Sequence, residues 1–216
     1  MALRGAVVPV TPFQQNCLVL WDDATRRAAV VDPGEAAPVL DAVRRLGASV
    51  ERVLLTHGHL DHASGAAEVA EALGGVPVEG PHEADRFLLD SLPDQAAPYG
   101  FPARAVTPSR WLAEGDSVDI AGHPFAVLHV PGHTPGHVVF HSAAHRLALV
   151  GDVLFAGSVG RTDFPYGDGA ALVRGIRAKL WPLGDDVAFL CGHGPGGSLG
   201  EERRTNPYAG EASGAP

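Results

Sequence analysis

The stretch Thr56-His57-Gly58-His59-Leu60-Asp61-His62 places four metal-binding side chains within six residues, and it decides how the fold is interpreted. It directly follows Val53-Leu54-Leu55, an apolar run typical of a buried strand. A chance match to the pattern H-x-H-x-D-H is rare, even in a chain of 216 residues with 11 histidines. We therefore interpret the stretch as a metal site.

The spacing of these donors constrains the local structure. Residues two apart share one side of an extended segment but not of a helix, so His57 and His59 can bind one ion only from a non-helical loop at a strand end. A helical zinc motif places its histidines four residues apart instead. Asp61 and His62 are adjacent and diverge from the first pair. The stretch therefore predicts two half-sites, each of which needs further ligands.

Three later segments place a ligand-capable side chain directly after an apolar run. These are His133 within Pro-Gly-His, Asp152 within Gly-Asp, and His193 within Gly-His. Side chains at the ends of packed strands are held by the core rather than by a mobile loop, as a site of fixed geometry requires. Together with the first stretch they supply seven donors, which are enough for a binuclear centre.

The order of these motifs resembles that of the metallo-β-lactamase-fold hydrolases over nearly the whole chain. This resemblance implies a ligand set of His57, His59 and His133 for one ion, and Asp61, His62 and His193 for a second ion, with Asp152 as the bridge between them. It also implies the family's four-layer αββα sandwich, an α/β (α+β) fold. We expect one such domain over residues 1–216.

Four flanking motifs more narrowly resemble glyoxalase II, the hydroxyacylglutathione hydrolases, in a short single-domain form. They lie at residues 12–17, 30–34, 160–164 and 206–207. The resemblance implies hydrolysis of a glutathione-type thioester such as S-lactoylglutathione, which yields a hydroxy acid and a free thiol. Full-length glyoxalase II adds a C-terminal helical domain with basic residues that bind glutathione, and we expect no such domain in this chain.

Two bound ions would account for the chemistry. A water held between them would have its pKa lowered from ~15.7 toward ~7 and would attack as hydroxide, so no Ser, Cys or Lys nucleophile is needed. One ion would stabilise the oxyanion, and the thiolate leaves readily because its pKa is low. We assign catalytic roles to Asp152, as the clamp, and to Asp61, which could also orient the hydroxide. Zinc is the expected metal, and iron and manganese stay open for a His/Asp site.

The resemblance also places substrate-binding residues in the loop Gly160-Arg161-Thr162-Asp163-Phe164, where glyoxalase II carries a basic residue that meets the glutathione backbone. Arg161 fills that place, and Phe164 and Tyr166 are expected to form the pocket wall. The alternative is that Arg161 pairs with Asp163 or Asp168 in a solvated loop.

Other functions stay open at this stage. Persulfide dioxygenases share the fold and the Gly-Arg-Thr-Asp-Phe loop, but they use one iron and consume oxygen. A hydrolase of another ester, a lactone or a phosphodiester has the same nucleophile, because the ligand set does not fix the substrate. A scaffold that binds a partner without turnover is disfavoured by the complete donor set.

Composition excludes several partners. The net charge of −9 and the absence of a Lys/Arg cluster argue against nucleic acid. The sequence has neither an 18-residue apolar run nor a recognisable signal peptide, so we expect a cytoplasmic protein without a membrane span. Cys17 and Cys191 are predicted to be buried thiols rather than a disulfide.

The remaining expectations concern elements and supporting residues. Strands are predicted at residues 6–10, 17–21, 28–32, 52–55, 117–120, 123–129, 138–141, 147–150 and 187–190. Helices are predicted at residues 36–46, 64–73, 83–91 and 169–180, with a loop over 92–102 and fraying from Ser198. His137 either hydrogen-bonds near the ligands or packs, and Asp32 either orients a ligand histidine or closes its turn.

Overall fold

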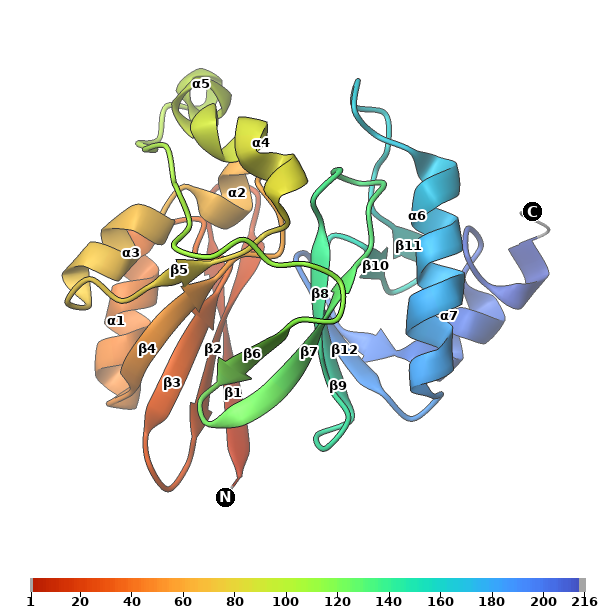
Figure 1. The fold of residues 1–216 in the computed structure, drawn as a ribbon, viewed down its shortest axis with the longest axis horizontal. Coiled ribbons are helices and arrows are strands. Elements are labelled where there is room, and N and C mark those ends of the chain that lie inside the picture. The colour runs from red at the N-terminus through yellow and green to blue at the C-terminus, as the bar shows by residue number, and fades with distance from the viewer. Residues whose placement is uncertain (1, 214–216) are drawn as a thin grey trace.

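Two β-sheets pack face to face, with helices on their outer faces, in the computed structural model, which describes residues 2–213 (Figure 1). The first sheet contains, in spatial order, β1 (Leu3–Val10), β2 (Gln15–Asp22), β3 (Arg27–Val31), β4 (Ser49–Leu54) and β5 (Val78–Glu79). The second contains β13 (Gly197–Ser198), β12 (Ala188–Cys191), β9 (Leu147–Gly151), β8 (Val138–Ser142), β7 (His123–His129) and β6 (Ser117–Ile120). A short hairpin pairs β10 (Leu154–Phe155) with β11 (Ser158–Val159).

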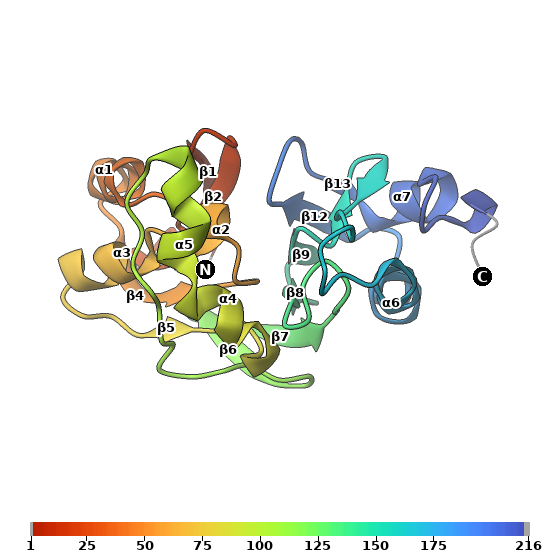
Figure 2. The same cartoon turned by 90° about the horizontal axis from the view of Figure 1, so that it is seen from above.

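The helices form the two outer layers. The first sheet is covered by α1 (Ala36–Leu46) and α3 (Ala66–Ala72), and the second by α6 (Gly169–Gly175) and α7 (Leu199–Thr205), while α6 continues as the π-helical turn η3 (Ile176–Leu180). Seen from above, α4 (Arg86–Asp90) and α5 (Leu92–Ala96) lie over the first half of the molecule (Figure 2). The predicted four-layer αββα sandwich is confirmed.

Three apolar clusters hold the layers together. One lies between the first sheet and α1 and α3, one between the two sheets, and one between the second sheet and α6 and α7. The helix α1 follows the predicted helical spacing, and Val39 and Val43 are buried in the first cluster. Each such side chain contributes roughly 1.5–3 kcal/mol when it is fully buried. The cores therefore fix the strand ends on which the site is built.

The strands that precede the candidate ligands end at one edge of the molecule. β3 and β4 are parallel, as are β9 and β12, and β7 runs in the same direction as β9 because β8 is antiparallel to both. The loops after these strands therefore meet at the upper edge in Figure 1, where α2 (Leu60–Ala63) also lies. This common edge explains why donors from distant parts of the sequence converge.

Two expectations about irregular segments are wrong. The chain does not fray over residues 198–213, because Ser198 caps α7 by accepting a hydrogen bond from the Glu201 amide, and Leu199 and Ala209 are buried in the third cluster. The rest of the predicted fraying tail, residues 214–216, lies outside the described residues. The segment expected to be a loop over 92–102 contains α5 and a 3₁₀ turn, η2 (Ala97–Tyr99), because a proline is compatible with the first turn of a helix.

Other elements agree with the expectations more closely. The helix predicted over 64–73 is present as α3 but begins later, because the Gly65 amide donates to the Pro33 carbonyl at 2.9 Å instead of to a helical carbonyl. Cys17 and Cys191 are free and buried, as predicted. Within residues 2–213, no helix combines the length and the apolar character that a membrane span needs.

Candidate metal centre

The first donor set consists of three histidines whose ring nitrogens face one another. His59 Nδ1 lies 3.1 Å from His57 Nε2 and 3.0 Å from His133 Nε2. His57 and His59 leave β4 in a non-helical loop, as their spacing predicted, and all three side chains are buried. Three imidazole nitrogens converge on one point, an arrangement that suits a transition-metal ion.

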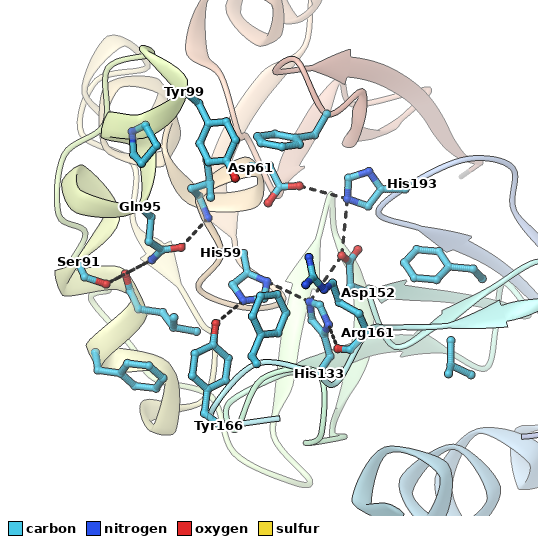
Figure 3. Close-up of a pocket in the computed structure, with 18 of the residues that line it drawn as sticks. His59, Asp61, Ser91, Gln95, Tyr99, His133, Asp152, Arg161, Tyr166 and His193 are labelled. Carbon is cyan, nitrogen blue, oxygen red and sulfur yellow. Dashed lines mark hydrogen bonds and ion pairs between the residues drawn. The ribbon is translucent and has the colours of Figure 1, made fainter. Parts of the chain in front are cut away.

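The second donor set lies beside the first. Asp61 Oδ2 is 3.2 Å from His193 Nε2 and 3.9 Å from His62 Nε2, so these three side chains surround a second point. Asp61 and His62 belong to the first turn of α2, whereas His193 follows β12. Two different elements therefore supply this set, and Figure 3 shows Asp61 and His193 facing each other across the pocket.

Asp152 stands between the two sets. Its Oδ1 lies 3.3 Å from His62 Nε2, and its Oδ2 lies 3.6 Å from both His133 Nε2 and His193 Nε2. One carboxylate thus reaches a histidine of the first set and two of the second. The seven predicted ligands are all brought together in the arrangement expected for a bridging carboxylate.

The chemistry of the donors fits two cations. His62 Nε2 and Asp152 Oδ1 are buried and, although they lie 3.3 Å apart, neither has a well-formed hydrogen bond among the described residues, which is costly for buried polar atoms. Burial lowers the pKa of His59 to about 3 and that of His57 well below its usual range, so both rings are neutral, as ligation requires. Burial alone would raise the pKa of Asp152, but the neighbouring histidines lower it and keep the carboxylate ionised.

The backbone at Gly192 passes very close to the Asp152 and His62 side chains. A Cβ at Gly192 would collide with Asp152 Oδ1 and would lie 2.5 Å from His62 Cε1. Only glycine can therefore bring the chain this close to the bridge, which is a physical reason for the Gly-His motif that ends β12.

Comparison with known proteins assigns the family. The family model of the metallo-beta-lactamase superfamily matches residues 10–193. The chain belongs to the metallo-beta-lactamase superfamily. It is 45% identical to the hydroxyacylglutathione hydrolase GloC of Haemophilus influenzae, over 94% of this chain and 96% of that protein.

Solved structures of the superfamily agree with the fold. The BLEG-1 B3 metallo-beta-lactamase has a TM-score of 0.86 at 32% identity, with 95% of this chain and 99% of that chain covered. TTHA1623, solved in a di-iron-bound form, has a TM-score of 0.83 at 36% identity, with 94% and 99% covered. The predicted resemblance to a short single-domain glyoxalase II is confirmed, and the chain is a superfamily hydrolase with clustered metal-binding residues.

As in other carboxylate-supported metal sites, buried polar groups orient the histidines of this superfamily member. Asp32 Oδ2 accepts hydrogen bonds from His62 Nδ1 at 2.9 Å and from Thr56 Oγ1 at 2.6 Å, and Thr56 Oγ1 lies 3.0 Å from His57 Nδ1. Both roles considered for Asp32 are therefore present: its side chain orients His62 directly and His57 through Thr56, and its carbonyl closes the turn by accepting from the Gly34 amide at 3.0 Å.

His137 contacts residues of the candidate centre without belonging to either donor set. Its ring stacks on His57 with 4.6 Å between centroids, and its Nε2 accepts a hydrogen bond of 3.0 Å from the Asp152 amide. Burial lowers its pKa well below the usual range, so the ring is neutral and can accept. His137 therefore both packs and hydrogen-bonds, and it fixes the backbone of Asp152.

Asp85 is a supporting residue that the sequence did not reveal. Its buried carboxylate accepts hydrogen bonds from the Gly58 amide at 3.0 Å, from Thr134 Oγ1 at 2.7 Å and from the Gly136 amide at 2.5 Å. It thereby joins the loop that carries His57 and His59 to the loop that carries His133. A lone aspartate in an amphipathic helical segment gives no sequence signal for this role.

The three predicted substrate residues line a pocket of about 1040 Å³ beside the donors (Figure 3). Arg161 also makes the alternative contact: its guanidinium pairs with Asp163 through two hydrogen bonds of 2.7 and 2.8 Å, and it lies over the Phe164 ring at 4.5 Å. Its carbonyl oxygen lies 2.8 Å from His133 Nδ1, so the same loop orients a ligand.

Tyr166 contacts the centre more directly than was expected. Its hydroxyl lies 2.9 Å from His59 Nε2, and burial raises the pKa of Tyr166 to about 12, so the hydroxyl stays protonated. Because His59 turns Nδ1 toward the other donors, a ring that binds a cation there carries its proton on Nε2 and donates it to this hydroxyl.

We expect Tyr166→Phe to weaken metal binding by about 10-fold, because this hydrogen bond orients a ligand. The measurement is a metal titration against a competing chromophoric chelator. Tyr99→Phe is the matched control, since Tyr99 lines the same pocket but its hydroxyl forms no hydrogen bond with any of the described residues. Equal affinities for the two variants would exclude this orienting role.

Proposed function

We propose that the protein hydrolyses a glutathione-type thioester, such as S-lactoylglutathione, to a hydroxy acid and a free thiol. The observation that carries the proposal is the pair of donor sets joined by Asp152 at the floor of an open pocket. The similarity to GloC, which spans nearly the whole of both chains, supports the substrate class. We further propose a single cytoplasmic domain that acts on a small molecule, with no nucleic-acid partner.

We assign metal-binding, catalytic and substrate-binding roles to separate groups of residues. His57, His59 and His133 would hold one ion and Asp61, His62 and His193 the other, with Asp152 shared. When bound, such ions polarise a carbonyl and activate a water at neutral pH. Asp61 has a second role, in which its carboxylate accepts a hydrogen bond from the attacking water. We assign Arg161, Phe164 and Tyr166 to substrate binding, because all three line the pocket.

Cysteine chemistry does not compete with this mechanism. Burial raises the pKa of Cys191 to about 11, and its thiol donates to the carbonyls of His193 and Pro195. Burial also raises the pKa of Cys17 well above its usual value. Both are thiols rather than thiolates at neutral pH, so neither is a nucleophile.

The second donor set favours a hydrolase over a mononuclear iron dioxygenase. The ligand atoms of Asp61, His62 and His193 lie within 4.8 Å of one another, so the chain offers a place for a second ion. Zinc is our proposed metal. Iron is the alternative, because TTHA1623 has been solved with two iron ions and its chain is 36% identical to this one.

The test is steady-state hydrolysis of S-lactoylglutathione, followed by the loss of thioester absorbance. We expect the wild type to turn over, and we expect activity to be lost after prolonged chelation and restored by added zinc. His133→Ala should be inactive, whereas His145→Ala, which removes a histidine outside both donor sets, should retain activity. A wild type as inactive as His133→Ala would refute the proposal.

A further inference from the structure

Exposed aromatic side chains gather at the mouth of the pocket. Within residues 2–213, the large apolar side chains that are exposed are Val7, Phe13, Phe87, Tyr99 and Tyr208. Three of these, Phe13, Phe87 and Tyr99, line the pocket beside the donors. Single exposed apolar residues are ordinary, but a cluster of them around a cavity marks a binding surface.

These aromatics form a wall of two ring clusters, one of which reaches the metal donors. The Phe13 and Tyr99 rings meet edge to face at 4.8 Å, and Phe87 meets Tyr166 at 5.2 Å. The Tyr166 ring stacks on the Phe164 ring with 5.3 Å between centroids, and the Tyr166 hydroxyl forms a hydrogen bond with His59. Figure 3 shows Tyr99 above His59 and Tyr166 below it, where the Tyr166 hydroxyl meets the His59 ring. An apolar group attached to a carbonyl at the centre would therefore lie against this wall.

The charges of the pocket are poorly suited to recognising an anionic thiol. Among the described lining residues, Arg161 is the single Lys or Arg side chain, and it is already paired with Asp163. The lining also contains Asp61, Asp94 and Asp152. Glutathione carries two carboxylates and one ammonium group, and this pocket offers one shared side-chain cation for the two carboxylates. Most of the selectivity must therefore come from the other half of the thioester.

We propose that the pocket selects thioesters with a bulky apolar acyl group, above all an aromatic one, which packs against the exposed aromatic side chains of the lining, Phe87 and Tyr99. This inference rests on the proposed thioester hydrolysis. The volume of about 1040 Å³ is at the upper end for a small-molecule site, so it has room for an acyl group larger than lactoyl together with the thiol half. An aromatic ring on the acyl group would stack on the wall and bury apolar area on both partners.

The experiment compares two thioesters that share the thiol and the hydroxyacyl carbonyl. S-mandeloylglutathione carries a phenyl group where S-lactoylglutathione carries a methyl group. We expect kcat/KM to be about 10-fold or more higher for the phenyl compound, in line with what several added carbon atoms gain in an apolar pocket. Phe87→Ala and Tyr99→Ala should each reduce this ratio several-fold. Tyr208→Ala, which removes an exposed aromatic ring outside the pocket, should leave the ratio unchanged.

The outcomes separate the two proposals. If both thioesters are hydrolysed and the lactoyl compound is the better substrate, or the two are equal, the acyl selectivity is overturned and the hydrolase function stands. A ratio that falls equally in Phe87→Ala, Tyr99→Ala and Tyr208→Ala also overturns the selectivity. If neither thioester is hydrolysed, the hydrolase function fails and the selectivity fails with it.

Discussion

The Asp152→Asn variant is expected to hold fewer than two ions per chain and to lose about 10³-fold or more in kcat/KM. This exceeds the ~10–100-fold that removal of a group beyond the ligands costs. Asp152 reaches both donor sets through its two oxygens, at 3.3 Å from His62 and 3.6 Å from His133 and His193. The amide introduced by Asp152→Asn would have one acceptor oxygen and no charge, so it could not contribute a ligand oxygen to both donor sets.

The change in metal content distinguishes this loss from a general defect. Metal per chain and thioester turnover are measured on the same preparation, with Asp186→Asn as the control because Asp186 is exposed and pairs with Arg146. The control should match the wild type in both quantities. An Asp152→Asn variant with two ions and near-normal turnover would show that the carboxylate does not bridge the sets.

Asp85→Ala is expected to lower the free energy of unfolding by about 2–4 kcal/mol, as measured by denaturant titration. The substitution leaves the Gly58 amide, Thr134 Oγ1 and the Gly136 amide buried without their acceptor, at roughly 1–3 kcal/mol each. Relief from the buried charge offsets part of this cost. Asp90→Ala, an exposed change in the same segment, should stay within about 0.5 kcal/mol of the wild type.

The pH dependence provides a second readout for Asp85. Burial raises its pKa to about 6, above the ~3.9 of an unfolded aspartate. Between about pH 4 and pH 6 the folded protein therefore holds a proton that the unfolded chain releases, and this contribution to stability falls as pH rises, by at most ~1.4 kcal/mol per unit. Asp85→Asn does not titrate at this position. The free energy of unfolding of the wild type, relative to that of Asp85→Asn, should therefore fall between pH 4 and pH 6. If this difference in the free energy of unfolding does not change with pH, the raised pKa of Asp85 is contradicted.

Donors tied to strand ends could be predicted because two short-range signals coincide there. An apolar run predicts the strand, and the residue that follows it is placed by the packed sheet. This logic predicts that His133, Asp152 and His193 lie beside the first stretch, and all three do. The role of Asp32 could be narrowed to two alternatives for the same reason, since it directly follows β3.

Residues that act through long-range contacts could not be predicted in this way. Asp85 lies 27 positions from Gly58 and 51 from Gly136, and no local pattern links them. The hydrogen bond from His59 to Tyr166 spans 107 positions. The order of the chain after Ser198 depends on burial of Leu199 and Ala209 against the second sheet, although the local composition is polar. In each case tertiary packing decides what the local sequence leaves open.

The most direct test of the binuclear hydrolase is the metal content per chain of protein purified without added metal, determined by elemental analysis. Oxygen consumption with glutathione persulfide is recorded on the same preparation. The two donor sets and the shared Asp152 predict about two ions per chain and no oxygen uptake. One iron per chain with oxygen consumed would contradict the account and identify a dioxygenase.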